Sequence, residues 1–256
     1  MKKKIILFFM ILMAIAIVVT IFTILTPENP APGDNISNFS KNVVLSDNTN
    51  ARCYGGYPWV EEEVYGRDVS AQTIHASGTL DEMGYSSDYY LESDSGLMLT
   101  NMSNSSVIYY IGHGCPSALC FDSSSCVIRD DVFEMNENQL NELDLAVYIS
   151  FGSASESRFG NIASETYKKG AKCVLGFDSA LLMENSKTWS DYFIDRLKAN
   201  LTVKDSADRA LWDEVLYYSG NSGNLEHVKI YGSKNIRINR NLMKPPNKQN
   251  SDKIAI

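Results

Sequence analysis

The amino-acid sequence predicts an α/β fold, a three-layer α/β/α sandwich around a mostly parallel sheet. Three short apolar runs, at 106–111, 145–151 and 172–177, are separated by segments with helical spacing. The runs lack strict alternation of apolar and polar residues, which is typical of strands that are buried on both faces of a sheet. Strands of this kind that alternate with helices favour the α/β class.

Helices are predicted around these runs. The segment from Ser70 to Gly84 is expected to be helical and to end at its glycine. A helix between the second and third runs is expected to be capped by Ser155. Two further helices follow the third run: one contains Trp189, and the next begins with the capping box that starts at Thr202. The segments 228–231 and 236–238 are predicted to close the domain as short strands.

The N-terminus predicts a membrane segment. Three lysines precede a run from Ile5 to Leu25 that has no charged residue, and this run is long enough to cross a bilayer as a helix. No small-residue cleavage site follows it. We therefore expect residues 1–26 to form an uncleaved signal anchor. The lysines place the N-terminus in the cytoplasm, so the main domain is expected on the outer side of the cell membrane.

The composition of the remaining chain indicates its domain boundaries and argues against nucleic acid as a partner. Residues 27–50 are rich in Asn, Ser, Pro and Asp and are expected to be a flexible linker, residues 51–243 the folded domain, and residues 244–256 a disordered tail. The net charge of -8 argues against nucleic acid as a partner. No glycine-rich phosphate loop is found, and neither a cofactor nor a metal is expected.

The five cysteines are compatible with an exported protein. Cys115, Cys120 and Cys126 lie close together in the sequence, and disulfide formation among them is expected outside the membrane. The odd number of cysteines leaves at least one thiol unpaired. A zinc site built from these three cysteines and His113 would have no recognised spacing.

Candidate chemistry lies where the first two apolar runs end. His113 stands between two glycines after the first run, and Gly152 and Ser153 follow the second. Carboxyl ends of parallel strands meet at one edge of a sheet, where α/β folds bind their ligands. His113 and the turn at Gly152 are therefore expected at the same edge.

An apolar strand that ends in His-Gly, followed by a strand that ends in a small-residue turn, resembles the caspase-like cysteine peptidases. The run 169–177, the helix with Trp189 and the segment 228–232 are also similar to gingipain and CHAT-type domains, so the resemblance covers roughly residues 70 to 238. It implies that His113 is the acid/base histidine and that Gly152 stands where the family has its nucleophilic cysteine. It also implies Gly114 and Asp178 as substrate-binding positions, Asp178 because related peptidases build their specificity pocket there.

Three functions remain open from the sequence. Because glycine has no side chain that can attack a carbonyl, the leading hypothesis is a catalytically degenerate pseudopeptidase that binds peptide or protein. The first alternative is an active peptidase or other acyl hydrolase that uses Ser153, or Cys115, with His113 as base. Against it, a serine at the start of a helix is often a cap, and Cys115 shares a loop with His113. The second alternative is a structural or adhesion ectodomain.

Overall fold

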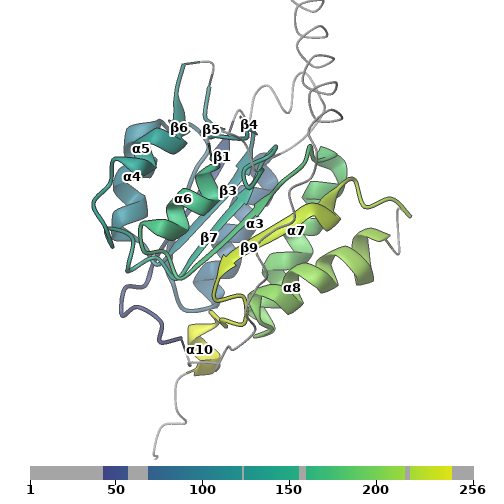
Figure 1. The fold of residues 1–256 in the computed structure, drawn as a ribbon. Helices are drawn as coiled ribbons and strands as arrows, with labels where there is room; N and C mark the ends of the chain where they lie inside the picture. The colour runs from purple at the N-terminus through teal and green to yellow at the C-terminus, as the bar shows by residue number, and fades with distance from the viewer. Residues whose placement is uncertain (1–42, 57–68, 123, 156–159, 217–219, 244–256) are drawn as a thin grey trace, which may run out of the picture. The chain divides into compact units, whose positions relative to one another are not determined.

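The computed structural model describes residues 43–56, 69–122, 124–155, 160–216 and 220–243 (Figure 1). The expected signal anchor, residues 27–42 of the expected linker and the expected tail lie outside these ranges. Within them, no helix has both the length and the apolar character that crossing a membrane requires.

A six-stranded sheet forms the centre of the domain, in the order β2-β1-β3-β7-β8-β9. All neighbouring strands are parallel except the last pair, β8 and β9. The predicted mostly parallel sheet is therefore confirmed. The strands are β1 (Asn50–Gly56), β2 (Ser86–Tyr90), β3 (Val107–Gly112), β7 (Leu145–Ile149), β8 (Cys173–Phe177) and β9 (Val228–Gly232).

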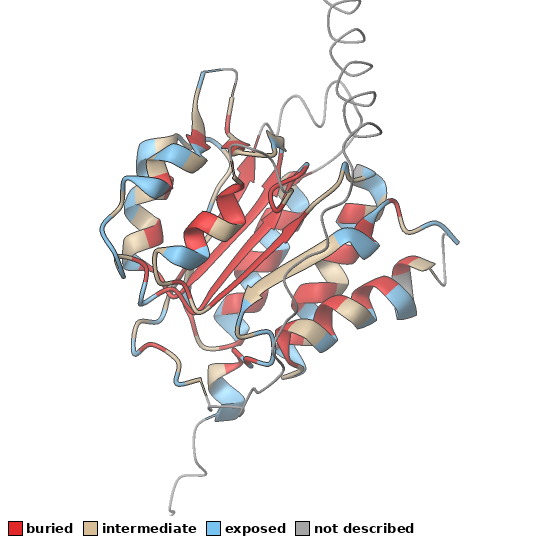
Figure 2. Ribbon diagram, in the orientation of Figure 1, coloured by how far each residue is buried: buried red, intermediate tan, exposed pale blue. Residues whose placement is uncertain are grey.

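Helices cover both faces of the sheet, which gives the predicted three layers (Figure 1). One face packs against α3 (Val69–Glu82), α7 (Met183–Lys198), α8 (Val203–Arg209) and the π-helix η1 (Ala210–Val215), and the other against α4 (Ser95–Asn104), α5 (Arg129–Phe133) and α6 (Ile162–Lys168). Along β3, Tyr109 belongs to the first core and Tyr110 to the second. The central strands are buried throughout (Figure 2), as their unbroken apolar runs predicted.

The helix with Trp189 packs as predicted. The Trp189 side chain is fully buried in α7, where its ring stacks on Phe193 at a centroid distance of 4.7 Å and meets Phe177 edge-on at 5.3 Å. The predicted cap of α8 is also present, because the Thr202 hydroxyl accepts a hydrogen bond from the backbone N–H of Asp205 at 3.0 Å. Local sequence signals were sufficient for both features.

Two local predictions were wrong. The helix α6 is capped by Asn161 and not by Ser155, because residues 150–155 form a tight turn in which the Ser155 N–H bonds to Gly152 O. The segment 236–238 is not a strand. Its two isoleucines are buried, and Ile236 O accepts a bond from the amide of Val203, so helix α8 takes the place of a partner strand.

A buried ion cluster lies at the amino-terminal ends of β7 and β8. The Asp144 carboxylate is fully buried and lies 2.7 Å from Lys172 Nζ and 3.2 Å from Arg240 Nη2. Burial raises the pKa of this carboxyl above its usual range, while the bond from Lys172 opposes the rise. Asp144 also accepts a bond from the amide of Ser46 at 2.9 Å. Residues 43–50, expected as part of the linker, therefore begin the packed domain.

A small antiparallel sheet lies beyond the end of β3. It consists of β4 (Gly114–Cys115), β5 (Ala118–Cys120) and β6 (Cys126–Ile128). A disulfide joins Cys120 to Cys126, which confirms a bridge among the three clustered cysteines. Cys115 is a free, exposed thiol.

Candidate functional site

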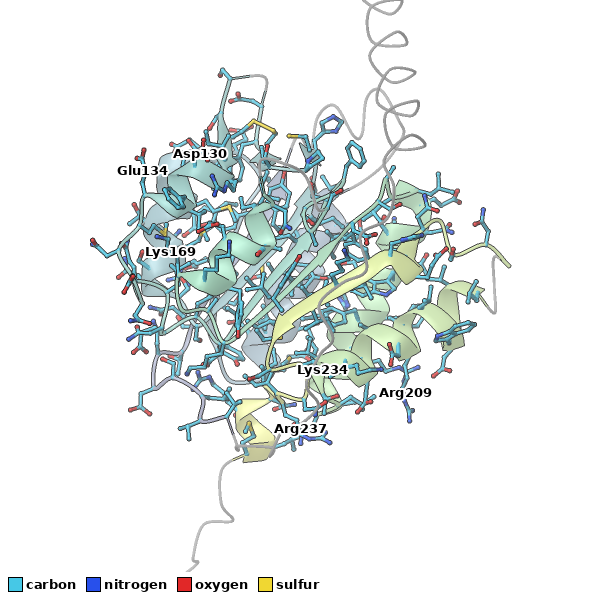
Figure 3. The ribbon with its side chains drawn as sticks, in the orientation of Figure 1. Asp130, Glu134, Lys169, Arg209, Lys234 and Arg237 are labelled. Carbon is cyan, nitrogen blue, oxygen red and sulfur yellow. A yellow bond between two sulfur atoms is a disulfide. The ribbon has the colours of Figure 1, made fainter. Side chains whose placement is uncertain are left out.

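The carboxyl edge of the sheet brings the predicted residues together. His113 follows β3 directly, and Gly152 follows β7, the parallel neighbour of β3. The Gly152 amide donates a hydrogen bond to Ser179 O at 3.1 Å, so the chain after β8 reaches the same place. The labelled basic side chains Arg209, Lys234 and Arg237 in Figure 3 lie near α8 and α10 (Arg240–Met243), toward the opposite end of the sheet.

The backbone at Gly152 is left-handed. Its φ is +61°, a conformation that residues with a side chain adopt only at a cost. A Cβ built there would lie 3.1 Å from Cγ of Pro116 and 3.4 Å from Cβ of Ser155. The loop that carries Pro116 thus packs directly on this position. The site is shaped for glycine, and a cysteine would meet both backbone strain and a close neighbour.

Ser153 is fully buried and its hydroxyl is already bonded. The Oγ atom donates to Tyr148 O at 2.9 Å and accepts from the Phe177 amide at 3.1 Å. These bonds join the ends of β7 and β8. A nucleophilic serine needs a base beside it and access to the substrate, whereas this hydroxyl is fully buried and donates its proton to a backbone carbonyl. The geometry therefore gives Ser153 a structural role and does not support it as a nucleophile.

The two glycines beside His113 are explained by close backbone approach. A Cβ on Gly114 would lie 2.0 Å from Ser150 Oγ and 2.6 Å from Ala118 O, and one on Gly112 would lie 2.3 Å from Gly56 O. No side chain fits at either position. Gly114, predicted as a substrate-binding residue, thus has a packing reason for being glycine.

The His113 backbone joins the large and the small sheet. Its amide donates to Gly56 O at 3.4 Å, and its carbonyl accepts from the Cys120 amide at 3.0 Å and from the Tyr110 hydroxyl. The residue itself is exposed. The sequence predicted that this histidine follows a strand, which is confirmed. It did not predict that His113 lies opposite Cys120, a disulfide cysteine.

Asp178 is paired with two neighbouring basic side chains. Its carboxylate lies 3.0 Å from His227 Nδ1 and 3.1 Å from Lys229 Nζ, and its side chain is 23% exposed. A basic ligand group at Asp178 would have to compete with both. The pairing of Asp178 with His227 could not be predicted from the sequence, because only the antiparallel pairing of β8 with β9 brings the two residues together.

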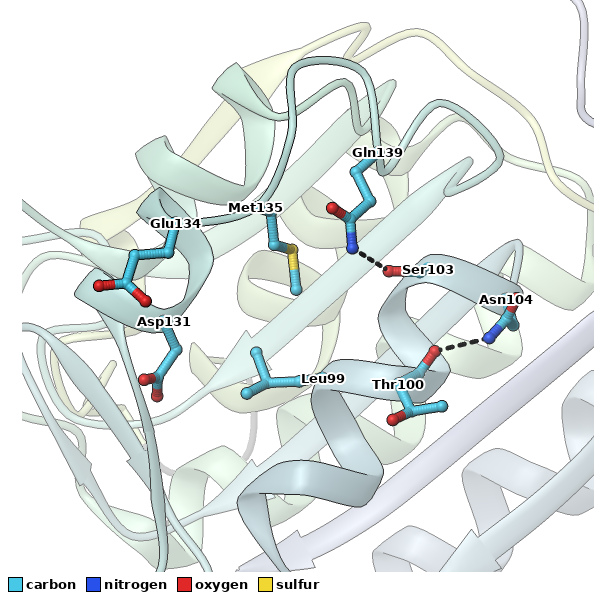
Figure 4. Close-up of a pocket in the computed structure, with 8 residues that line it drawn as sticks. All are labelled: Leu99, Thr100, Ser103, Asn104, Asp131, Glu134, Met135 and Gln139. Carbon is cyan, nitrogen blue, oxygen red and sulfur yellow. Dashed lines mark hydrogen bonds between the residues drawn. The ribbon is translucent and has the colours of Figure 1, made fainter.

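A pocket lies away from this edge, between α4 and the segment that begins with α5 (Figure 4). Its volume is about 500 Å³, and none of the predicted site residues lines it. Leu99 and Met135 form its apolar part, the carboxylates of Asp131 and Glu134 lie at one end, and Gln139 bonds across it to α4. The pocket could not be expected from the sequence, because the short helices α4 and α5 have no strong helical periodicity.

Comparisons with known proteins identify the fold. No family model matches the chain, and no curated protein matches it. The structure is similar to the Arg-specific cysteine proteinase gingipain R, with a TM-score of 0.59, 13% identity, and coverage of 75% of this chain and 48% of that one. It is also similar to the complex of the gingipain pro- and mature domains from Porphyromonas gingivalis, with a TM-score of 0.54, 12% identity, and coverage of 74% and 48%.

The chain thus spans about half the length of the gingipain structures that it matches. A separase–securin complex from Saccharomyces cerevisiae matches with a TM-score of 0.48, 16% identity, and coverage of 75% of this chain and 12% of that one. At these identities the likeness concerns the fold and not the activity. The chain therefore has the caspase-like α/β fold of the gingipains, as its sequence predicted.

Proposed function

We propose that this chain is a pseudopeptidase: a caspase/gingipain-like domain that has lost catalysis and binds a peptide or protein segment at the carboxyl edge of its sheet. We further propose that residues 1–26 anchor it in the cell membrane with the domain outside. The observation that carries the proposal is Gly152, whose left-handed backbone stands at the position that the family resemblance assigns to the nucleophile.

Loss of catalysis follows from what the nearby side chains do. Covalent peptide hydrolysis in this fold needs a thiolate that faces the histidine across the scissile bond. Gly152 has no side chain, and the hydroxyl of Ser153 is bonded to two backbone groups inside the core. Cys115 lies two residues from His113 in the same short segment after β3, so the two side chains do not come from separate elements that face each other across a cleft.

Binding is supported by apolar side chains exposed at this edge. Phe151, the residue before Gly152, is 47% exposed, and Leu182, in the segment that follows β8, is 51% exposed. Exposed aromatic and large aliphatic side chains beside strand ends offer contact area to a partner. A structural or adhesion ectodomain would keep the scaffold without needing these contacts.

The test uses the full chain in a non-ionic detergent. We expect no turnover of a mixed peptide library or of ester substrates, and retention of a subset of the peptides. Phe151→Ser should weaken the retained peptides about tenfold or more, as loss of an interface aromatic does. The matched control is Ile74→Ser, which removes a similarly exposed apolar side chain (45%) from helix α3 and should change nothing.

Two other outcomes would contradict the proposal. Turnover that both Ser153→Ala and His113→Ala abolish would establish a serine-based enzyme. An inactive chain that retains no peptide would favour the scaffold alternative. For the location, a membrane-impermeant maleimide should label Cys115 on intact cells, and labelling only after lysis would refute an outward-facing domain.

A further inference from the structure

The small sheet β4–β6 gathers three cysteines on one face. Leu119 and Val127 are fully buried on its inner face. Successive residues of a strand point to opposite faces, so Cys120 and Cys126, which flank them, lie on the outer face. Cys115, the neighbour of Gly114 on β4, shares that face because Gly114 pairs with the inward Leu119. A free thiol and a disulfide therefore stand side by side.

The strand register fixes which sulfur is nearer. Cys115 pairs with Ala118, and Cys120 pairs with Cys126. Cys115 is thus the diagonal neighbour of Cys120 on the adjacent strand, whereas Cys126 lies one strand further away. Diagonal neighbours have Cα atoms about 7–8 Å apart, and a disulfide spans up to about 6.8 Å. A small shift of the two-residue strand β4 is sufficient to bridge them.

We propose that Cys115 and the Cys120–Cys126 disulfide form a thiol–disulfide exchange site. The Cys115 thiolate attacks Sγ of Cys120, a new Cys115–Cys120 bond forms, and the Cys120–Cys126 bond breaks. The electron pair leaves on Sγ of Cys126, which takes up the proton that Cys115 gave to its surroundings. Nothing is oxidised or reduced in total, so the bridge moves without any added reagent.

Surroundings favour the attack. His113 lies opposite Cys120, whose amide bonds to the His113 carbonyl, and His113 is exposed. Directly opposed residues of an antiparallel pair share a face, so the proposal places the His113 imidazole on the same face as Cys120, as an acceptor for the Cys115 thiol proton. The remaining thiols, Cys53 and Cys173, are excluded from the chemistry. Burial raises the pKa of each to about 12, which leaves them protonated and out of reach.

The exchange has a consequence for the neighbouring edge. Pro116 follows Cys115 and packs on Gly152. A bridge to Cys115 would therefore pull on the loop that covers this position, and the two isomers would present different surfaces there. The exchange itself does not rest on the proposed binding function and can be tested without a ligand.

A matched pair of full-length variants tests the geometry. Cys115→Ser keeps Cys120 and Cys126, and Cys126→Ser keeps Cys115 and Cys120. Each is equilibrated in a glutathione redox buffer, quenched with acid and digested with pepsin, which can cleave after Leu119 and Phe121 and so separate the three cysteines. Mass spectrometry then maps the bridges. Both variants should form their bridge, with equilibrium constants within about a hundredfold, or roughly 60 mV. A Cys126→Ser chain that carries only glutathione adducts overturns the proposal.

The second measurement uses the wild-type chain, so its main result does not depend on whether a variant folds. After incubation at mildly alkaline pH without reductant, it is treated with N-ethylmaleimide and mapped in the same way. We expect alkylated Cys126 together with a Cys115–Cys120 linked peptide, and both should be lost in Cys115→Ser. If Cys115 is the only alkylated residue of the three after long incubation, exchange does not occur and the proposal fails.

Discussion

Gly152→Ala measures whether the nucleophile position can still hold a side chain. An alanine at φ +61° must adopt the left-handed conformation, which costs about 1–2 kcal/mol. Its Cβ would also lie 3.1 Å from Cγ of Pro116, closer than ordinary contact, so the loop must shift by a few tenths of an ångström. Together these effects should lower the free energy of unfolding by about 2 kcal/mol.

Two other glycines serve as controls. Gly220 has a φ of +64°, and a Cβ added there would have nothing within 4 Å, so Gly220→Ala isolates the backbone strain and should lose about 1–2 kcal/mol. Gly78 lies inside α3, also in open space, and Gly78→Ala should gain about 0.5–1 kcal/mol. Gly152→Ala should be the least stable of the three.

Urea unfolding of the full chain in a non-ionic detergent, followed by tryptophan fluorescence, reads out all three variants. Trp189 is fully buried against Phe193 and enters water on unfolding, so it reports on the core. A Gly152→Ala chain as stable as wild type, beside a destabilised Gly220→Ala chain, would refute the reasoning. A cysteine would then fit at this position, and Gly152→Cys should be assayed for restored peptidase activity, which we otherwise expect to be absent.

Three further predictions concern buried groups. Ser153→Ala removes the hydroxyl that joins β7 to β8 and leaves a buried amide without its acceptor, so urea unfolding should show a loss of about 1–3 kcal/mol. Asp144→Asn removes the buried negative charge that Lys172 and Arg240 share, and should lower the free energy of unfolding by about 3 kcal/mol. As a control, neutralising the exposed Lys204–Asp208 pair should lower it by less than about 1 kcal/mol in the same assay. Alkylation of the native chain at neutral pH should modify Cys115 rapidly, and Cys53 and Cys173 only on unfolding. Burial raises the pKa of these two thiols to about 12, so almost no thiolate forms on them until the pH approaches that value. Rapid modification of all three cysteines would contradict the buried placement of Cys53 and Cys173.

Much of the central sheet could be predicted from local pattern. The strands β3, β7 and β8 are apolar on both faces, so they appear as short unbroken runs in the sequence. The strands β1 and β2 were not predicted. β2 is an edge strand, mostly exposed and rich in polar residues, and β1 has the polar residues Asn50 and Arg52 among its first three. Their strand character comes from pairing with β3 and with each other, which no local pattern records.

The candidate edge was predictable only in outline. Parallel strands must end at one edge, so the sequence was sufficient to expect His113 and Gly152 there. It was not sufficient to show that the Ser153 hydroxyl turns inward, or that Asp178 pairs with His227. Both depend on the way β7, β8 and β9 align, and that alignment joins residues far apart in the chain.

The sequence by itself determined the α/β class, the order of the central strands and helices, and the absence of a nucleophilic side chain at position 152. These follow from burial periodicity and from the chemistry of individual residues, which are local properties. Tertiary structure alone decided the left-handed turn at Gly152, the bonded state of Ser153, and the shared face of Cys115 with the Cys120–Cys126 disulfide. Each of these depends on strand register and on close backbone approach between distant segments, because a hydroxyl, a thiol or a turn has no fixed role until its neighbours across the sheet are in place.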